Sequence, residues 1–120
     1  MSFQANIKEL ALDNENFRKV IHTGENSQLV LMSLKPGEEI GEETHDGVDQ
    51  ILFFVDGDGK AVIDGHTESI TIDDVVFVPA GTLHNFINTG DSDMKLYTVY
   101  SPPEHPDGTI HATKEDAMQE

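Results

Sequence analysis

The chain has 120 residues, of which 37% are hydrophobic, and this is the size and composition of one globular domain with a single core. Cysteine is absent, which excludes disulfides, thiolate metal sites and a cysteine nucleophile. The protein is acidic, and its net charge of -16 opposes binding to nucleic acid and to anionic membranes, so neither is expected as a partner. The N-terminal residues have no basic start and no unbroken apolar run, and this predicts a cytoplasmic protein.

A short helix is predicted near the N-terminus, within residues 1–16. Asn6 is a favourable N-cap residue, and Glu9 follows it three positions later, as in a helix-capping pattern. Ile7, Leu10 and Ala11 then share one face of the helix. This apolar face predicts packing against the rest of the domain.

From residue 17 onward the chain consists of brief apolar runs separated by Gly, Asp and Asn, with a turn signal roughly every eight to twelve residues. Asp64-Gly65 is the signal of a two-residue hairpin. This pattern predicts an all-β sandwich or barrel over residues 17–101. The predicted strands are 18–22, 29–35, 50–55, 60–63, 66–72, 75–78, 84–88 and 94–100.

Residues 102–120 are predicted to form an irregular C-terminal tail that ends in a short helix. The tail begins with a proline-rich stretch, and Thr113 is followed three residues later by Asp116, which is a second capping pattern. No shift in composition marks a domain boundary, so the three segments are expected to form one domain.

Four side chains in two short segments are candidate metal ligands. Glu43 and His45 are two residues apart, so they point the same way in extended backbone. Gln50 opens the next predicted strand after a short loop, and His84 follows the rigid turn Pro79-Ala80-Gly81. Two imidazoles and one carboxylate suit iron, zinc, manganese, cobalt or nickel, and they match the facial triad of non-haem iron sites. Gln50 is a weak donor that either completes the ligand set or hydrogen-bonds a bound water or substrate.

The spacing of these residues resembles the two motifs of the cupin family. The first motif here reads Gly37, five residues, Glu43, Thr44, His45, four residues, Gln50, six residues and Gly57, and the second reads Asp73, five residues, Pro79, Ala80, Gly81, two residues, His84, three residues and Asn88. The resemblance covers residues 37–88 and implies the RmlC-like, type 2 cupin fold, a double-stranded β-helix or jelly-roll barrel. Glu43 stands where the family has its first His, Gln50 where it has Glu, and Asp73 where it has Gly.

For the site, the resemblance implies a divalent metal ion bound by Glu43, His45, Gln50 and His84. The ion would be iron, zinc, manganese or nickel. The residues exchanged at the metal positions are still oxygen donors rather than apolar side chains. The alternative is a cupin that has lost its metal and kept its barrel.

Alternation along the strands predicts which side chains face the pocket. Gln50 and His84 pointing inward bring their same-face neighbours inward too, and the predicted lining is Met32, Leu34, Leu52, Phe54, Phe86, Leu96, Thr98 and Tyr100. Ile51, Phe53 and Val55 then face outward and need cover, either from the N-terminal helix or from another subunit. Because many cupins that resemble this chain pair sheet against sheet, a homodimer is expected.

The leading functional hypothesis is a small metalloenzyme, a dioxygenase, isomerase or lyase, whose small substrate binds the metal through a carbonyl or hydroxyl oxygen. One alternative is a sugar or sugar-phosphate isomerase, by resemblance to cupin phosphomannose isomerases, whose zinc ligands are also Gln, His, Glu and His. Against it, Arg18 is the only arginine, which leaves few cations to bind a phosphate. A third hypothesis is a non-catalytic module that binds a small molecule.

Overall fold

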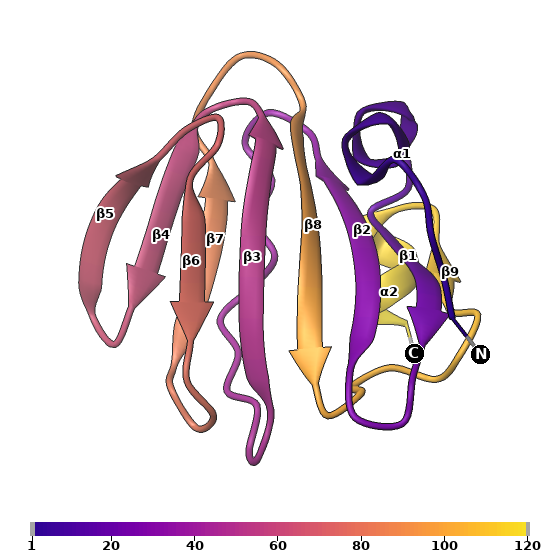
Figure 1. Cartoon of the computed structure of the whole chain (residues 1–120). Coiled ribbons are helices and arrows are strands. Elements are labelled where there is room, and N and C mark those ends of the chain that lie inside the picture. The colour runs from indigo at the N-terminus through magenta and orange to yellow at the C-terminus, as the bar shows by residue number, and fades with distance from the viewer. Residues whose placement is uncertain (1, 120) are drawn as a thin grey trace.

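The computed structural model describes residues 2–119, which form a barrel of two antiparallel sheets (Figure 1). The larger sheet has the strand order β6 (Val75–Val78), β3 (Asp49–Asp56), β8 (Met94–Ser101), β2 (Gln28–Leu34), β1 (Arg18–Thr23), β9 (Ile110–His111). The smaller sheet has the order β5 (His66–Ile70), β4 (Gly59–Ile63), β7 (His84–Asn88). Helix α1 (Ile7–Asp13) precedes the strands, and helix α2 (Lys114–Met118) follows them. The expected all-β jelly-roll barrel with a short N-terminal helix is therefore confirmed.

The local signals in the sequence produce the expected elements. Strands β6 and β7 have the predicted bounds, and the other predicted strands differ from the observed ones only at their ends. Asp64 and Gly65 have φ of 51° and 83°, as a two-residue hairpin turn with two positive φ angles requires. The N-cap of α1 is also present, because Glu9 N donates to Asn6 Oδ1 at 3.1 Å.

The C-terminal tail contains a strand that the sequence analysis did not predict. Strand β9 pairs with β1 at Arg18 and Lys19. Two residues are too few to show an alternating pattern, so the local sequence carries no signal for this strand. The predicted start of α2 is confirmed, since Thr113 Oγ1 accepts from Asp116 N at 3.1 Å and Asp116 Oδ2 accepts from Thr113 N at 3.3 Å. The tail is thus irregular only in part.

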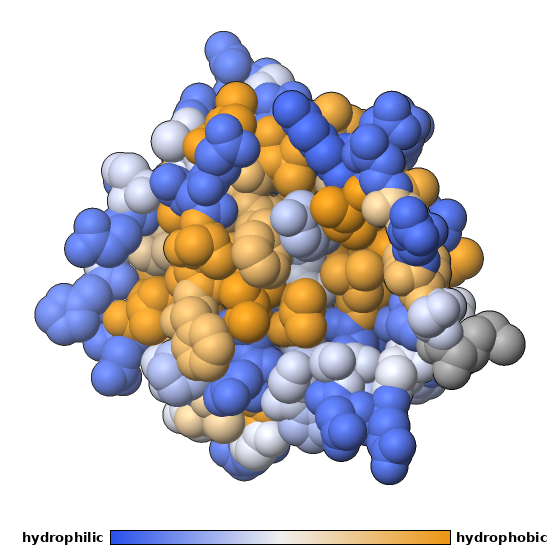
Figure 2. Space-filling view, in the orientation of Figure 1, coloured by the Kyte–Doolittle hydropathy of each residue, from blue (hydrophilic) through white to orange (hydrophobic). Residues whose placement is uncertain are grey.

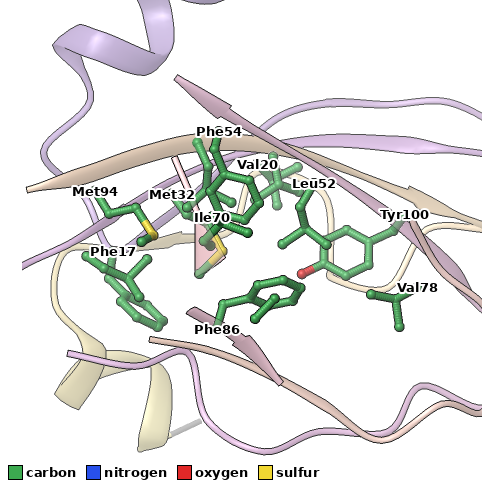
Figure 3. Packing of buried hydrophobic residues seen from close by; sticks show 14 of the residues in the cluster. Phe17, Val20, Met32, Leu52, Phe54, Ile70, Val78, Phe86, Met94 and Tyr100 are labelled. Atoms are coloured by element: carbon green, nitrogen blue, oxygen red, sulfur yellow. The ribbon is translucent and has the colours of Figure 1, made fainter. Parts of the chain in front are cut away.

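The apolar core lies between the two sheets. All the side chains predicted to face inward are buried, namely Met32, Leu34, Leu52, Phe54, Phe86, Leu96, Thr98 and Tyr100. That they line a ligand pocket stays a prediction. In Figure 3, Phe17 and Met94 lie at one end of the core, while Val78 and Tyr100 lie at the other. The candidate metal ligands gather at the Tyr100 end.

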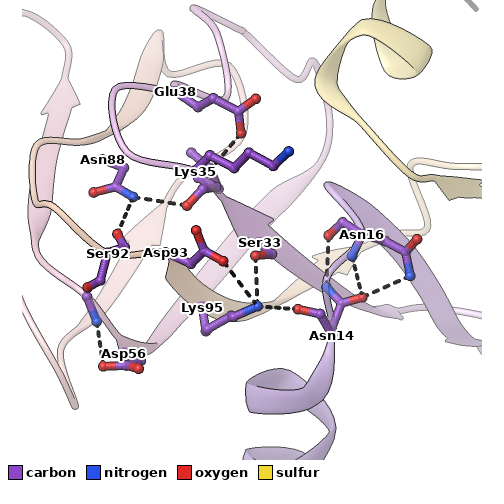
Figure 4. A network of polar contacts seen from close by, with 12 residues as sticks. Asn14, Asn16, Ser33, Lys35, Glu38, Asp56, Asn88, Ser92, Asp93 and Lys95 are labelled. Atoms are coloured by element: carbon purple, nitrogen blue, oxygen red, sulfur yellow. Dashed lines mark hydrogen bonds and ion pairs between the residues drawn. The ribbon is translucent and has the colours of Figure 1, made fainter.

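Helix α1 packs against the outer face of the larger sheet and is anchored there by Lys95 (Figure 4). Lys95 points outward from β8, yet it is only 8% exposed. Its Nζ donates to Asn14 O at 2.5 Å and to Ser33 Oγ at 3.0 Å, so the end of the helix satisfies the buried ammonium. Among the helices of residues 2–119, none has the length and apolarity needed to cross a membrane.

The close approach of strands at Gly59 gives a first test of the packing. A Cβ at this position would overlap Met94 Cε and the carbonyl oxygen of Ile87. Because the Ile87 backbone cannot move aside as a side chain can, we expect Gly59→Ala to lower the free energy of unfolding by roughly 1 to 3 kcal/mol, measured by urea denaturation. Gly90→Ala is the control, since a Cβ there would meet its nearest atom at 3.4 Å. Equal losses in the two variants would contradict the packing argument.

Candidate metal centre

Reciprocal backbone hydrogen bonds place Glu43 beside His84. Each residue donates its N–H to the carbonyl oxygen of the other at 2.9 Å, which joins the segment before β3 to the start of β7. Residues opposite each other in an antiparallel pair project their side chains to the same side. Glu43 belongs to no longer strand, so this isolated bridge fixes its position.

The turn before β7 fixes the backbone of His45. Gly81 has a φ of 81° and donates its N–H to the His45 carbonyl oxygen at 2.9 Å. Glycine adopts this φ with little strain, whereas most other residues do not. Ala80 N donates to Asp49 Oδ1 at 2.9 Å, so the same turn is also tied to the start of β3. The turn therefore joins both segments that carry candidate ligands.

Donor atoms of Glu43, His45 and His84 lie within 4.8 Å of one another, so the structure brings three of the four candidate ligands together. His45 Nε2 and Glu43 Oε2 are 2.9 Å apart, but Nε2 makes no hydrogen bond of good direction. Two donors at right angles on one ion, each with a bond of about 2.1 Å, would be about 3.0 Å apart. The observed spacing therefore fits two ligands of one ion.

Both histidines present Nε2 to this cluster because their Nδ1 atoms are engaged elsewhere. His84 Nδ1 is 2.8 Å from Thr82 O, and a carbonyl oxygen only accepts, so Nδ1 carries the proton. His45 Nδ1 is 3.4 Å from Glu104 Oε1. A ligating histidine usually has its second ring nitrogen oriented by a carbonyl or a carboxylate in this way.

Gln50 turns its side-chain oxygen toward the interior. It is 2% exposed, and its Nε2 donates to Thr98 Oγ1 at 3.1 Å. The Thr98 hydroxyl in turn donates to Ile51 O at 2.9 Å, so it can only accept from Gln50. This chain of hydrogen bonds fixes the orientation of the amide, and Gln50 Oε1 has no partner within residues 2–119.

Unpartnered buried polar atoms are concentrated around Tyr100. In the part of the chain that the structure describes, these atoms are Arg18 Nε, His45 Nε2, Gln50 Oε1 and His105 Nε2. Gln50 is directly opposite Tyr100 between β3 and β8, and the Tyr100 ring centroid is 5.7 Å from that of His45 and 5.1 Å from that of His105. Arg18 lies close enough to affect the pKa of Tyr100. Because buried polar groups in proteins are nearly always satisfied, the cluster indicates a binding site.

The C-terminal tail closes this end of the barrel through Gln28. Gln28 Oε1 accepts from Glu104 N at 3.2 Å and from His105 N at 3.0 Å, and Gln28 Nε2 donates to His105 O at 2.7 Å. These bonds hold Glu104 beside His45 and His105 beside Tyr100. Gln28, Glu104 and Arg18 carry no local signal that assigns them to the site, since their partners are distant in the sequence.

Electrostatics couple Glu43 to His45. Burial opposes ionisation of Glu43, but the 2.9 Å contact with His45 and the positive charge of that ring outweigh it, so the pKa of Glu43 is lowered. The contact with Glu43 raises the pKa of His45 against the effect of burial, and Glu104 adds to this rise. The metal-free pair is therefore stabilised as carboxylate and imidazolium.

Burial has the opposite consequence at Tyr100 and His105. It raises the pKa of Tyr100 far above its ordinary value, so this hydroxyl stays protonated and can donate a hydrogen bond. Burial also lowers the pKa of His105 to about 4, with a further contribution from the positive charge of Arg18. His105 is therefore neutral near pH 7.

Comparisons with known proteins agree with this barrel. Residues 30–100 match the family model described as Cupin domain. The uncharacterized protein YrkC of Bacillus subtilis is 43% identical over 122 residues, which cover 97% of this chain and 66% of that protein. The crystal structure of BH2720 from Bacillus halodurans is similar with a TM-score of 0.98 at 39% identity, covering 100% of this chain and 96% of that one. A 5-nitrosalicylic acid 1,2-dioxygenase of Bradyrhizobium sp is 31% identical over 67 residues, covering 56% of this chain and 32% of that protein.

The low pKa of His105 predicts how stability depends on pH. Its pKa is about 4 in the folded protein and near the ordinary 6.5 in the unfolded chain. Between these values the unfolded chain binds a proton that the folded protein does not, so the contribution of His105 to stability falls as the pH drops from 6.5 to 4.

We expect the difference in unfolding free energy between wild type and His105→Gln to shift by about 1 to 2 kcal/mol in favour of the variant over this pH range. The full shift is not expected, because the ring keeps some contact with water. Urea denaturation in EDTA measures the difference. A difference that stays constant with pH would show that His105 titrates normally in the folded state.

Proposed function

This chain belongs to the cupin family, and we propose that it is a metal-dependent enzyme whose small substrate binds the ion through a carbonyl or hydroxyl oxygen. Glu43, His45 and His84 would hold the ion, with Gln50 as a weak fourth ligand. The observation that carries the proposal is that donor atoms of Glu43, His45 and His84 lie within 4.8 Å of one another, while Gln50 Oε1 is buried without a hydrogen-bond partner in residues 2–119.

The donor set suits iron, zinc, manganese or nickel. When bound, such an ion supplies Lewis acidity to a substrate oxygen, and iron also supplies reactivity with dioxygen. The chain itself orients the ligands through Thr82, Glu104 and Thr98. Tyr100 offers a protonated hydroxyl that can donate to a substrate oxygen, and the buried apolar side chains next to it exclude water.

The relation to a dioxygenase of Bradyrhizobium favours the enzymatic hypothesis, although this chain spans only 32% of that protein. A non-catalytic module that binds a small molecule is the alternative from another class. The two are separated by incubating the metal-loaded protein with small hydroxy and oxo compounds. Binding without conversion, both with and without dioxygen, would favour the module.

Metal content tests the proposal directly. We expect protein purified without added metal to retain a transition metal ion, and we expect Glu43→Ala and His84→Ala to weaken metal affinity by at least about a hundredfold, because each removes a ligand. Elemental analysis and zinc titration measure this. Glu42→Ala is the matched control, since it removes an exposed carboxylate one residue from Glu43. Wild type that neither retains nor takes up a transition metal would contradict the proposal.

We also propose that this protein is a homodimer whose two subunits pair through the outer face of the larger sheet. Two cross-strand rows form an apolar patch there, and Figure 2 shows apolar side chains gathered on this face. The apolar patch consists of Ile51, Phe53, Val75, Phe77, Tyr97 and Val99. Val75 is 58% exposed and Phe77 is 55% exposed, so α1 leaves this part of the sheet uncovered. The cytoplasmic location expected from the sequence stays a prediction.

Sedimentation and light scattering test the dimer. We expect wild type to be a dimer at micromolar concentration and Phe77→Asp to be a monomer, because the charge would be buried without a partner. Ile110→Asp is the control, since Ile110 has the same 58% exposure as Val75 but lies on β9, the opposite edge of the sheet. A monomeric wild type, or equal dissociation of both variants, would contradict this interface.

A further inference from the structure

The only arginine of the chain, Arg18, points into the barrel. On β1 it stands opposite Met32, which is fully buried in the core, and it also stands opposite His111 of β9. Residues directly opposite in antiparallel strands share a face of the sheet, so Arg18 shares the inner face with Met32. Arg18 is accordingly 6% exposed.

The positive charge of Arg18 has no counter-ion in contact. Among residues 2–119, no carboxylate oxygen forms an ion pair with it. Its Nη1 is 3.3 Å from His111 Nδ1, which accepts the hydrogen bond because a guanidinium only donates. Arg18 Nε has no hydrogen-bond partner in the part of the chain that the structure describes. A buried guanidinium in this situation is costly unless an anion joins it.

Arg18 also lies next to the candidate metal centre. The charge of its guanidinium acts electrostatically on Tyr100, His105 and Glu43. The Tyr100 ring is in turn 5.7 Å from the ring of His45. The guanidinium is thus linked electrostatically both to Glu43 of the ligand cluster and to Tyr100 beside His45.

We infer that Arg18 binds the carboxylate of a small substrate whose second oxygen donor reaches the metal centre. This inference rests on the function proposed above for Glu43, His45 and His84. A carboxylate accepts two parallel hydrogen bonds from one edge of a guanidinium, and the unpartnered Nε lies on such an edge. With a divalent ion bound, the positive charge of the ion and Arg18 exceeds the negative charge of Glu43 and Glu104, so the site favours an anionic ligand.

The surroundings of Arg18 favour a carboxylate over a phosphate. Phosphate sites gather several cationic or backbone donors around a group of higher charge. The other lysine or arginine that is buried within residues 2–119 is Lys95, and it faces away from the barrel interior toward Asn14. One guanidinium, whose carbon lies 5.2 Å from the centroid of the apolar Phe17 ring, matches a planar monoanion.

Calorimetric titration of the zinc-loaded protein with glycolate and with its neutral amide, glycolamide, tests the inference. We expect wild type to prefer glycolate, and we expect Arg18→Gln to lose about ten- to a hundredfold in glycolate affinity while it keeps its zinc. Lys19→Gln is the matched control, because it removes a cation from the adjacent position on the other face of β1, and it should bind glycolate as wild type does.

Each outcome separates the two proposals. Failure of wild type to bind zinc would overturn the metal centre, and titration of the metal-free wild type and Arg18→Gln with glycolate would still test the arginine. Zinc binding with unchanged glycolate affinity in Arg18→Gln would overturn the role of Arg18 alone. Should Arg18→Gln fail to fold, the preference of wild type for glycolate over glycolamide decides the matter, and its absence counts against the inference. Inorganic phosphate binding more tightly than glycolate would overturn the carboxylate assignment.

Discussion

The pair of hydrogen bonds between the backbones of Glu43 and His84 is the constraint on which the site depends. Within residues 2–119, these two bonds of 2.9 Å are the only pairing that Glu43 has with a strand, and they join a connecting segment to the smaller sheet. The Gly81 N–H adds a third bond, to the His45 carbonyl. Backbone hydrogen bonds tolerate changes of side chain, so the geometry of the ligand cluster is set independently of which donors occupy it. The site is therefore preorganised, as tight binding of an ion or a substrate requires.

The barrel interior is divided between stability and function. At one end, Phe17 and Met94 belong to a close-packed apolar cluster that supplies hydrophobic stabilisation. At the other end, Gln50 Oε1 and His105 Nε2 are buried near Tyr100 without a hydrogen-bond partner among residues 2–119. Leaving such atoms buried typically costs about 1 to 3 kcal/mol each, so this arrangement persists only because the rest of the barrel offsets it. Gln28 is also a buried polar residue, and its side chain bonds to the backbone of the C-terminal tail, which holds the tail across this end of the barrel.

The sequence predicted the parts of this structure that local patterns encode. Alternating apolar runs located the strands, and Glu43 and His45 were expected to point the same way because they are two residues apart. That His84 would join them was implied by the resemblance of the motif spacing to the cupins. Arg18 and Gln28 could not be assigned to the site in this way. Arg18 contacts His111, and Gln28 contacts Glu104 and His105, through pairings between segments more than seventy residues apart. Only the completed barrel brings these segments together, and strand β9 was missed because its two residues are too few to show an alternating pattern.

Glu43 and Gln50, the two residues that differ from the cupin metal ligands, each suit the exposure to water of the position that they occupy. The Glu43 side chain keeps 31% of its surface exposed, whereas Gln50 is only 2% exposed. A carboxylate at position 50 would have to lose nearly all contact with water beside Tyr100, and burial of a charge is far more costly than burial of an amide. An amide there retains a ligand oxygen, with its nitrogen satisfied by Thr98. Glu43, the charged candidate metal ligand, thus lies where water can reach it, and the neutral Gln50 lies where water cannot. Within the described residues, the interior near Arg18 therefore has no carboxylate from the protein, which favours the carboxylate of a bound small molecule.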